Sequence, residues 1–308
     1  MPEAPACGIL NVNKPSGLTS FDVVRVVKRG SGINKAGHAG TLDPAATGVL
    51  LVCLGQAVSI SEYLMRLPKT YLAEITLGIS TTTYDAEGEV TLQGDFSRVS
   101  EGDLLRVLEG FVGQIEQTPP AFSAIKTGGE RAYRLARRGE AVALKPRRAD
   151  IYAIRLLKFE SPSVEVEVEC GKGTYIRSLA HDIGERLGCG GHLGSLGRTR
   201  VGPFDVADGV TLEQLEPRLA AGDWRQHLLP MDYGLMHLPA VTLHIEDEKD
   251  LRHGQALHID EDRTASLGEV LPGMECRAYA EDGSLAGIIR YNEEGGLWRA
   301  RKVFAPCA

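Results

Sequence analysis

Alternating apolar and polar positions mark several strands along this chain. Residues 71–79 place an apolar side chain at every second position, and residues 164–170 alternate valine with glutamate. A period of two puts successive apolar side chains on one face, which is typical of a half-buried strand. Residues 9–12, 49–54 and 151–159 are apolar runs that also predict strands.

The helical period appears in four other stretches. The predicted helices lie over residues 20–29, 60–67, 100–112 and 176–187. Thr19 or Ser20 is expected to cap the first helix and Gly30 to end it. The pattern Ser59-Ile60-Ser61-Glu62 predicts a capping box at the start of the second. The third is expected to turn Leu105 inward with its apolar neighbours and to end at Gly113.

The pattern changes near residue 237. Beyond it, short strands alternate with glycine turns such as Glu281-Asp282-Gly283-Ser284, which is typical of a small β domain. Before it, strands and helices mix without regular βαβ repetition. We therefore predict an α+β domain over residues 1–237, with a mainly antiparallel mixed sheet flanked by helices, and a small β-rich domain over residues 238–308.

Composition places the chain among ordinary globular proteins. Of its 308 residues 43% are hydrophobic and 24% charged, and no apolar run approaches the roughly 20 residues that span a bilayer. Residues 1–7 lack the features of a secretory signal, so we expect a cytoplasmic protein without a membrane segment. The six cysteines form no C-x-x-C pair, so we expect reduced thiols and no metal site.

Charge is distributed unevenly. The net charge of −7 weighs against nucleic-acid binding, yet residues 126–158 hold ten Lys or Arg residues against three acids, a local net of +7. Residues 240–308 carry thirteen acids and eight bases, a net of −5. The basic run is either a solvated charged helix or a mobile arm, and its Gly128-Gly129 and Lys145-Pro146 breaks favour the arm.

The loop over residues 37–48 is the strongest chemical signal. It places Asp43 among small, turn-forming residues, and Pro44 biases Asp43 toward extended backbone. Gly40 and Gly48 allow unusual backbone angles or close approach of a ligand. The alternative is a plain surface turn, since Gly, Asp and Pro are the usual turn residues. The loop alone does not decide between these two interpretations.

Five motifs together carry a family resemblance. They are Lys14-Pro15-Ser16-Gly17, Gly37-His38-Ala39-Gly40-Thr41-Leu42-Asp43-Pro44, Lys69-Thr70-Tyr71, Gly173-Thr174-Tyr175-Ile176-Arg177-Ser178-Leu179 and Leu196-Gly197-Arg198-Thr199. In order and spacing they resemble the bacterial TruB family of tRNA pseudouridine synthases. The resemblance implies the pseudouridine synthase fold, a C-terminal PUA-like RNA-binding domain, and cofactor-free conversion of the T-loop uridine at position 55 of tRNA into pseudouridine.

The resemblance also implies roles for individual residues. Asp43 would be the catalytic carboxylate, acting covalently on the sugar or on a glycal, as carboxylates do in glycosidases. Tyr71 would stack on the flipped uracil and assist proton removal, although an aromatic residue in an alternating strand is usually core. Arg177 would pair with Asp43 and keep it ionised. Without the resemblance, a lone arginine near a helix start would mean little.

Further positions follow from the same resemblance. Tyr175, Ile176 and Leu196 would wall the uracil pocket, although Leu196 alone would be ordinary core. His38 would insert into the opened T-loop and replace stacking lost when bases leave it. Lys14 is expected to brace the catalytic loop, and Asp85 to be structural or to contact RNA.

The basic segment matches the RNA-clamping insertion of the family. We place this insertion at residues 118–158, and its expected phosphate-contacting residues are Lys126, Arg131, Arg134, Arg137, Arg138, Arg147 and Arg148. The expected partner is the T-arm of tRNA, with no obligate protein partner and a monomeric chain. Gly194 and Gly197 depart from the family pattern, which often has bulkier or charged residues there, so local RNA contacts could differ.

Two other functions remain open on the sequence. One is a tRNA-binding and tRNA-folding protein in which catalysis is secondary. The other is a nucleotide-binding enzyme, suggested by Gly171-Lys172-Gly173-Thr174, but this fragment lacks the spacing of a phosphate-binding loop.

Overall fold

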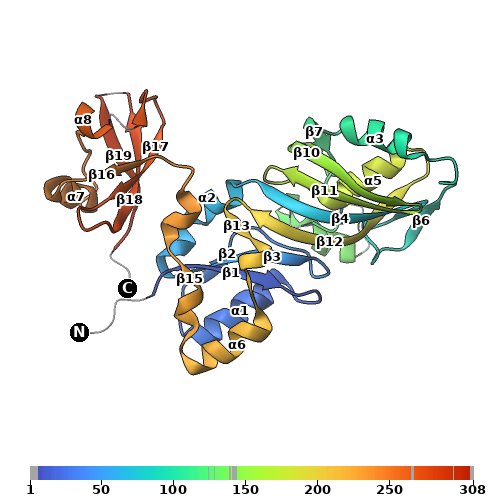
Figure 1. The fold of residues 1–308 in the computed structure, drawn as a ribbon, viewed down its shortest axis with the longest axis horizontal. Coiled ribbons are helices and arrows are strands. Elements are labelled where there is room, and N and C mark those ends of the chain that lie inside the picture. The colour runs from blue at the N-terminus through green and yellow to red at the C-terminus, as the bar shows by residue number, and fades with distance from the viewer. Residues whose placement is uncertain are drawn as a thin grey trace.

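A long mixed β-sheet forms the frame on which most of the chain is built (Figure 1). The structure is a computed structural model that describes residues 6–123, 125–127, 129–138, 140, 144–264, 267–293 and 295–305. The side chains of Lys126, Arg131, Tyr133, Arg137 and Glu261 lie outside this description. Eleven strands make up the main sheet.

The central path of the main sheet has eight strands. In spatial order they are β14 (Val210–Thr211), β1 (Gly8–Lys14), β3 (Thr47–Leu54), β12 (Gly191–Val201), β4 (Lys69–Leu77), β11 (Ser163–Cys170), β10 (Arg147–Glu160) and β7 (Gly113–Gln117). Three short strands join its edges, namely β2 (Ala36–His38) on β3, β13 (Phe204–Asp205) on β12 and β15 (Leu228–Leu229) on β1. Only the β1–β14 and β3–β12 pairs are parallel, so the predicted mainly antiparallel sheet is confirmed.

Four helices cover one face of the sheet. They are α1 (Ser20–Ser31), α3 (Glu101–Glu109), α5 (Ile176–Arg186) and α6 (Leu212–Ala221). Their apolar stripes share one core cluster with alternate strand residues such as Leu50, Val52 and Val166. Figure 1 shows α1 and α6 below one half of the sheet, and α3 and α5 beside the other.

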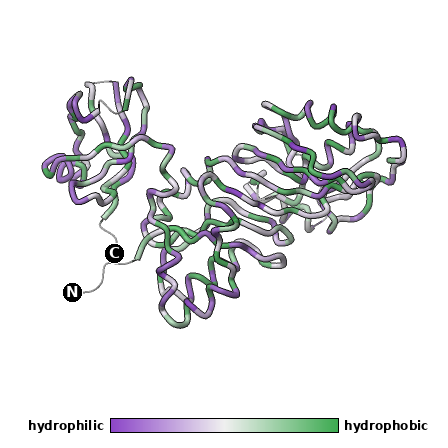
Figure 2. Tube along the Cα trace, in the orientation of Figure 1, coloured by the Kyte–Doolittle hydropathy of each residue, from purple (hydrophilic) through white to green (hydrophobic). Residues whose placement is uncertain are grey.

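Only part of the sheet is covered on its second face. There, Val49, Leu51 and Cys53 of β3 pack under η1 (Gly55–Ile60), α2 (Ser61–Arg66) and η4 (Met231–Leu235). The far half leaves this face to polar residues, which explains the valine and glutamate alternation of β11. Figure 2 shows the resulting mixture of hydrophobic and hydrophilic segments along these strands.

Helix boundaries differ from the sequence predictions in three places. Helix α1 passes through Gly30 and ends at Gly32 with a φ of 70°, because Gly30 serves instead for close packing on Leu219 of α6. The predicted capping box at residue 59 is wrong: the Ser59 hydroxyl donates to the Gln56 carbonyl inside η1. Helix α3 ends at Glu109, before Gly113, and Leu105 is 42% exposed.

A separate four-stranded sheet begins at Ala240. Its order is β16 (Ala240–Thr242), β17 (Glu275–Tyr279), β18 (Leu285–Asn292) and β19 (Leu297–Val303). It has its own core cluster, which includes Trp298, and is flanked by α7 (Ile245–Arg252) and α8 (Glu261–Thr264). Figure 1 shows this β-rich part beside α2, as predicted for the C-terminal residues.

The remaining short elements lie in loops. They are β5 (Ile79–Thr81) paired with β6 (Val90–Gln93), β8 (Lys126–Thr127) paired with β9 (Glu130–Arg131), α4 (Ala132–Arg137), η2 (Val206–Asp208) and η3 (Trp224–His227). The basic segment is therefore not one solvated helix. Its residues from Arg147 onward belong to β10, so the part from 147 to 158 is a strand of the main sheet rather than a free arm.

Two sequence expectations concern thiols and membranes. Cys7 is disulfide-bonded, so the expectation of six reduced cysteines is wrong at this position, whereas Cys53, Cys170, Cys189 and Cys276 are free. The spacing of cysteines along the chain does not reveal a pairing made by the fold. No helix within the described residues is long and apolar enough to cross a membrane.

Candidate active site

Hydrogen bonds from Lys14 and Ser20 anchor the loop that carries Asp43. Lys14 at the end of β1 is fully buried, and its Nζ donates to the Pro44 carbonyl at 3.1 Å and to two carbonyls of its own turn. The Ser20 hydroxyl at the start of α1 accepts the Leu42 N–H at 2.8 Å and donates to the Leu42 carbonyl at 3.1 Å. These contacts fix the backbone on both sides of Asp43, so the loop is more than a simple surface turn.

Asp43 forms an ion pair with Arg177. Arg177 Nε lies 2.9 Å from Asp43 Oδ2, and the exposed fractions of the two side chains are 8% and 46%. Arg177 comes from the first turn of α5, whereas Asp43 lies between β2 and β3. The buried guanidinium therefore holds a carboxylate that still faces solvent, and a substrate could reach it.

Arg177 has three further partners. Its Nη1 lies 3.2 Å from Asp85 Oδ2 and donates to the Thr83 carbonyl at 3.3 Å, and its Nη2 donates to the Phe122 carbonyl at 3.0 Å. A planar guanidinium bonded on all sides has little freedom to turn. Asp85 therefore belongs to the site as a partner of Arg177.

Tyr71 lies in β4 with 9% of its surface exposed and belongs to the main core cluster. Burial raises the pKa of the Tyr71 hydroxyl, and the negative charge of Asp43 adds to the rise, while the charge and hydrogen bonding of Arg198 oppose it. The ring of Tyr71 is therefore part of the core, and its hydroxyl shares an electrostatic environment with Asp43.

Tyr175 and Ile176 mark the start of α5. The buried Gln117 of β7 bonds both backbone groups of Tyr175, accepting its N–H at 3.0 Å and donating to its carbonyl at 3.1 Å. Burial raises the pKa of the Tyr175 hydroxyl, and Arg147, Arg177 and Asp43 all act on it electrostatically. Tyr175 is thus close to the ion pair, and Gln117 is a supporting residue that no sequence pattern indicated.

His38 and Leu196 lie on two other strands, β2 and β12. His38 of β2 is partly buried, and burial together with the positive charge of Arg198 lowers its imidazole pKa. Leu196 of β12 stands opposite Ala73 of β4 and packs on the main core.

Arg198 is the main site residue that the sequence did not single out. It is 2% exposed, and its Nε donates to the Val49 carbonyl at 2.8 Å and its Nη2 to the Gly40 carbonyl at 3.0 Å. It pairs across the sheet with Gly48 on one side and Tyr71 on the other. A Cβ at Gly48 would lie 2.1 Å from the Arg198 carbonyl oxygen, so only glycine fits there.

The stacked rings of Tyr84 and His181 connect the Asp85 loop with α5. Tyr84, the residue before Asp85, has a φ of 63°, which is unusual for a residue other than glycine. Its ring stacks on His181 of α5 with centroids 4.0 Å apart and an interplanar angle of 8°. His181 follows Arg177 by one helical turn, so the stack joins the Asp85 loop to the helix that carries Arg177.

The predicted RNA-binding cations differ in their surroundings. Arg134, Arg147 and Arg148 are exposed, and Arg147 acts electrostatically on Tyr175. Arg138 is bound at 2.6 Å by both Glu130 and Glu140. The side chains of Lys126, Arg131 and Arg137 lie outside the described residues. Within the described part of the chain, no group of three or more His, Cys, Asp or Glu side chains could hold a metal ion.

Comparisons with known proteins agree with these features. Residues 28–176 match the N-terminal domain of TruB family pseudouridylate synthases, and residues 177–236 match the C-terminal domain of tRNA pseudouridylate synthase B. The tRNA pseudouridine synthase B of Dehalococcoides mccartyi (strain CBDB1) is 45% identical over 298 residues, 96% of each chain. That of Symbiobacterium thermophilum is 47% identical over 252 residues, 81% of this chain and 82% of the relative.

Solved structures show the same architecture. A chain in a Cbf5-Nop10-Gar1 complex aligns with a TM-score of 0.74 at 28% identity, covering 99% of this chain and 91% of that chain. A chain in an H/ACA RNP bound to a substrate RNA containing 2'-deoxyuridine aligns with a TM-score of 0.72 at 27% identity, covering 97% and 85%. The alignments span the main sheet and the C-terminal β-rich part together.

Proposed function

Because this chain belongs to the TruB family of pseudouridylate synthases, we infer that it is a tRNA pseudouridine synthase, an isomerase that acts on tRNA. We further propose that its target is the T-loop uridine at position 55 and that Asp43 is the catalytic carboxylate. The observation that carries this proposal is the pairing of the half-exposed Asp43 with the buried Arg177.

The chemistry needs few groups. The N-glycosidic bond breaks, the uracil turns while it is still held, and carbon 5 bonds to the sugar as its proton leaves. Asp43 supplies the carboxylate that attacks the sugar or a glycal, and Arg177 holds it in orientation. Tyr71 stacks on the uracil and assists removal of the proton, while Tyr175, Ile176 and Leu196 exclude water. No cofactor is required by this scheme.

Access to the uridine requires that it leave the T-loop. We propose that the base flips into the site and that His38 takes part of the vacated space, which offsets some of the few kcal/mol lost on unstacking. The lowered pKa of His38 keeps the imidazole neutral near pH 7 and suits this stacking role. Lys14 braces the Asp43 loop through the Pro44 carbonyl.

We propose that residues 1–237 form the catalytic domain and that exposed cations within 118–158 contact RNA phosphates. Arg134, Arg147 and Arg148 are the described candidates, since Arg138 is already bound by two glutamates. Lys126, Arg131 and Arg137 stay in the proposal on the sequence alone. Phosphate contacts of this kind would make binding sensitive to salt.

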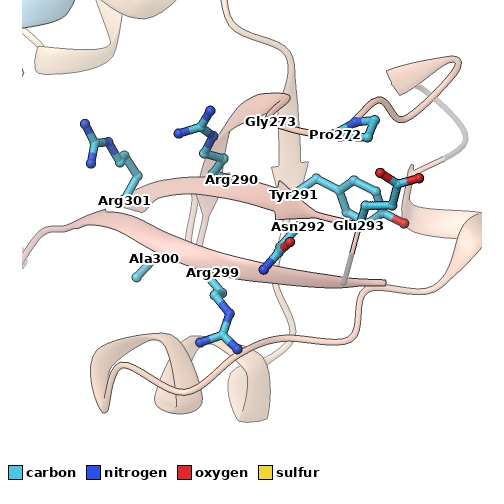
Figure 3. Close-up of a pocket in the computed structure, with 9 residues that line it drawn as sticks. All are labelled: Pro272, Gly273, Arg290, Tyr291, Asn292, Glu293, Arg299, Ala300 and Arg301. Atoms are coloured by element: carbon cyan, nitrogen blue, oxygen red, sulfur yellow. The ribbon is translucent and has the colours of Figure 1, made fainter. Parts of the chain in front are cut away.

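We also propose that residues 238–308 form a PUA-like RNA-binding domain. Although this region is acidic, it holds a hollow of about 550 Å³ that is bordered by Arg290, Arg299 and Arg301 (Figure 3). Arg290 and Arg299 stand opposite each other on β18 and β19, and neither is ion-paired within the described residues. Figure 3 shows Arg290 and Arg301 extending to one side of this strand pair and Arg299 to the other, and these positive charges favour an anion such as a phosphate.

A tRNA-folding protein is the alternative function. It would need the same RNA surface but not the geometry around Asp43, which a pure binder has no reason to maintain. We propose that the enzyme works in the cytoplasm as a monomer without an obligate protein partner, because its substrate is a single tRNA.

The decisive experiment measures tritium release from tRNA transcripts labelled at uracil carbon 5. Wild type should release tritium, whereas Asp43→Asn should not, and a transcript with cytidine at the target position should release none from that site. Wild type that binds tRNA without releasing tritium would favour the folding protein. Release by Asp43→Asn at the wild-type rate would remove Asp43 from the chemistry.

A further inference from the structure

We propose that Arg198 is a positioning residue that ties the loop carrying Asp43 to the strand carrying Tyr71 and holds its positive charge beside the Tyr71 hydroxyl. This inference rests on the proposed roles of Asp43 and Tyr71. It assigns the function to a buried arginine that touches neither substrate nor solvent.

The position of Arg198 in the sheet is the first argument. Strand β12 lies between β3, which follows the Asp43 loop, and β4, which carries Tyr71. Arg198 is in register with Gly48 of β3 and with Tyr71 of β4. One residue therefore stands at the junction of the two strands that deliver the proposed catalytic groups.

The hydrogen bonds of Arg198 are the second argument. Its guanidinium donates to the carbonyls of Val49, at 2.8 Å, and Gly40, at 3.0 Å. Its Nη1 also lies 3.6 Å from the position that a Cβ on Gly40 would take. Gly40 begins the short stretch that ends at Asp43, and its φ of 98° sets the direction of that stretch. Arg198 thus holds the loop at Gly40, whereas Lys14 holds it at Pro44.

The charge of Arg198 is the third argument. A buried guanidinium is costly unless its charge is used or paired. Arg198 is 2% exposed and forms no ion pair with any described residue; it donates to the Val49 and Gly40 carbonyls and interacts with the Tyr71 side chain. Its field reaches several neighbours: burial lowers the pKa values of Lys14, His38 and Lys69 and the charge of Arg198 adds to this, whereas it opposes the rise that burial causes in the pKa of Tyr71.

This field suits the proton transfer assigned to Tyr71. In that step the C5–H bond breaks, its electron pair restores the ring double bond, and the proton passes to the Tyr71 oxygen. A buried phenol whose pKa is raised is a poor acceptor near neutral pH, because little of it is ionised. A fixed positive charge next to the hydroxyl stabilises the phenolate form and so favours the transfer.

The test compares Arg198→Met, which removes the charge, with Arg198→Lys, which keeps it but loses the planar fork. Arg200→Met is the matched control, since Arg200 lies on the same strand but is exposed and paired with Asp205. The measurements are the single-turnover rate of tritium release at saturating tRNA, the dissociation constant for tRNA, and the pH titration of the Tyr71 ¹³Cζ resonance, assigned with Tyr71→Phe.

We expect Arg198→Met to lose about 100-fold in single-turnover rate, the size of effect that follows a small misplacement of reacting groups, with tRNA affinity nearly unchanged. Its Tyr71 resonance should titrate at higher pH than in wild type. Arg198→Lys should recover part of both, and Arg200→Met should match wild type. If Arg198→Met does not fold, Arg198→Gln takes its place as the neutral variant.

Equal rate losses in the lysine and neutral variants, with an unmoved Tyr71 titration, would overturn the proposal and leave Arg198 as a packing residue. Wild-type rates in the neutral variant would overturn it as well. Failure of the proposed function looks different, because wild type itself would then release no tritium.

Discussion

The Nε atom of Arg177 lies 2.9 Å from Oδ2 of Asp43, across a gap between two elements far apart in the sequence. The arginine is buried and the carboxylate is half exposed, so the pair has a fixed side and an accessible side. Asp85 occupies another edge of the same guanidinium at 3.2 Å. The orientation of Asp43 thus depends on residues that never need to touch the substrate.

Removal of this guanidinium should abolish most activity. Arg177→Met leaves Asp43 without its counter-charge and should lower the rate of tritium release by about 100-fold or more, because the reacting carboxylate is no longer held. Asp85→Asn should cost less, since an amide oxygen can still accept from Arg177. Asp205→Asn, in the exposed pair with Arg200, is the control. Equal activity in Arg177→Met and wild type would contradict the pairing as a functional contact.

The Tyr84–His181 stack should matter for the same reason. His181→Ala removes a ring from a pair of parallel rings 4.0 Å apart, which should destabilise the fold by about 1 kcal/mol. It should also reduce the rate by roughly 10-fold, because the Asp85 loop loses its hold on α5. Tyr84→Phe keeps the stack and should behave as wild type. Denaturant unfolding and tritium release, measured on both variants, check this.

Gly48 offers a test of close strand approach. Gly48→Ala would place a Cβ 2.1 Å from the Arg198 carbonyl oxygen at a φ of 100°, so we expect a loss of about 3 kcal/mol or more in unfolding free energy. Gly17 has a similar φ of 89° but open space around it. Gly17→Ala should therefore show the backbone strain alone, about 1 kcal/mol. Similar losses in both variants would mean that β3 can move away from β12.

Lys69 gives a pH-dependent prediction. Burial lowers the pKa of Lys69 to about 8, against 10.5 in the unfolded chain. Between these values the unfolded chain holds a proton that the folded chain does not, so rising pH favours the folded state. Relative to Lys69→Met, wild type should gain stability from pH 8 to 10.5, by roughly 3 kcal/mol at the upper limit. A pH-independent difference between the two proteins would show that Lys69 titrates normally.

Salt dependence separates the arginines of the basic segment. Arg147→Ala should weaken tRNA binding and reduce the slope of log K against log salt by about 1, since an exposed cation releases one counterion on contact. Arg138→Ala should change the slope less, because Arg138 is held by Glu130 and Glu140. Filter binding at several salt concentrations measures both. A larger effect at Arg138 would mean that its glutamate partners release it on binding.

Periodic patterns of apolar residues predicted several strands and helices of the fold correctly. The alternation over residues 71–79 and 164–170 identified β4 and β11, because one face of each strand is open to solvent there. The sequence patterns did not predict strand β12, because its glycines interrupt the alternation of apolar and polar residues. Its position is set by pairing with β3 and β4. Gly30 was misjudged because a glycine that permits helix contact looks the same as one that ends a helix.

The site was predictable only where a motif signalled it. Asp43, Arg177 and Tyr71 stand in recognisable motifs, and the structure places them in one electrostatic neighbourhood. Gln117 and His181 act through a backbone clamp and a ring stack, and neither leaves a local pattern. Arg198 was within a quoted motif, yet its contacts with Gly40 and Val49 exist only once β3 and β12 lie parallel.

The packing of Phe304 has a consequence for the order in which the protein is made. Phe304 and Ile288 complete the cluster formed by Ile9, Leu51 and their neighbours from the beginning of the chain. The side-chain amide of Gln56 bonds the backbone of Ala305 twice: its Nε2 donates to the Ala305 carbonyl and its Oε1 accepts the Ala305 N–H, each at 2.8 Å. During synthesis the ribosome delivers Ile9 first and Phe304 almost three hundred residues later. Until the last strand has emerged, this cluster lacks Ile288 and Phe304, and apolar side chains from the beginning of the chain stay exposed.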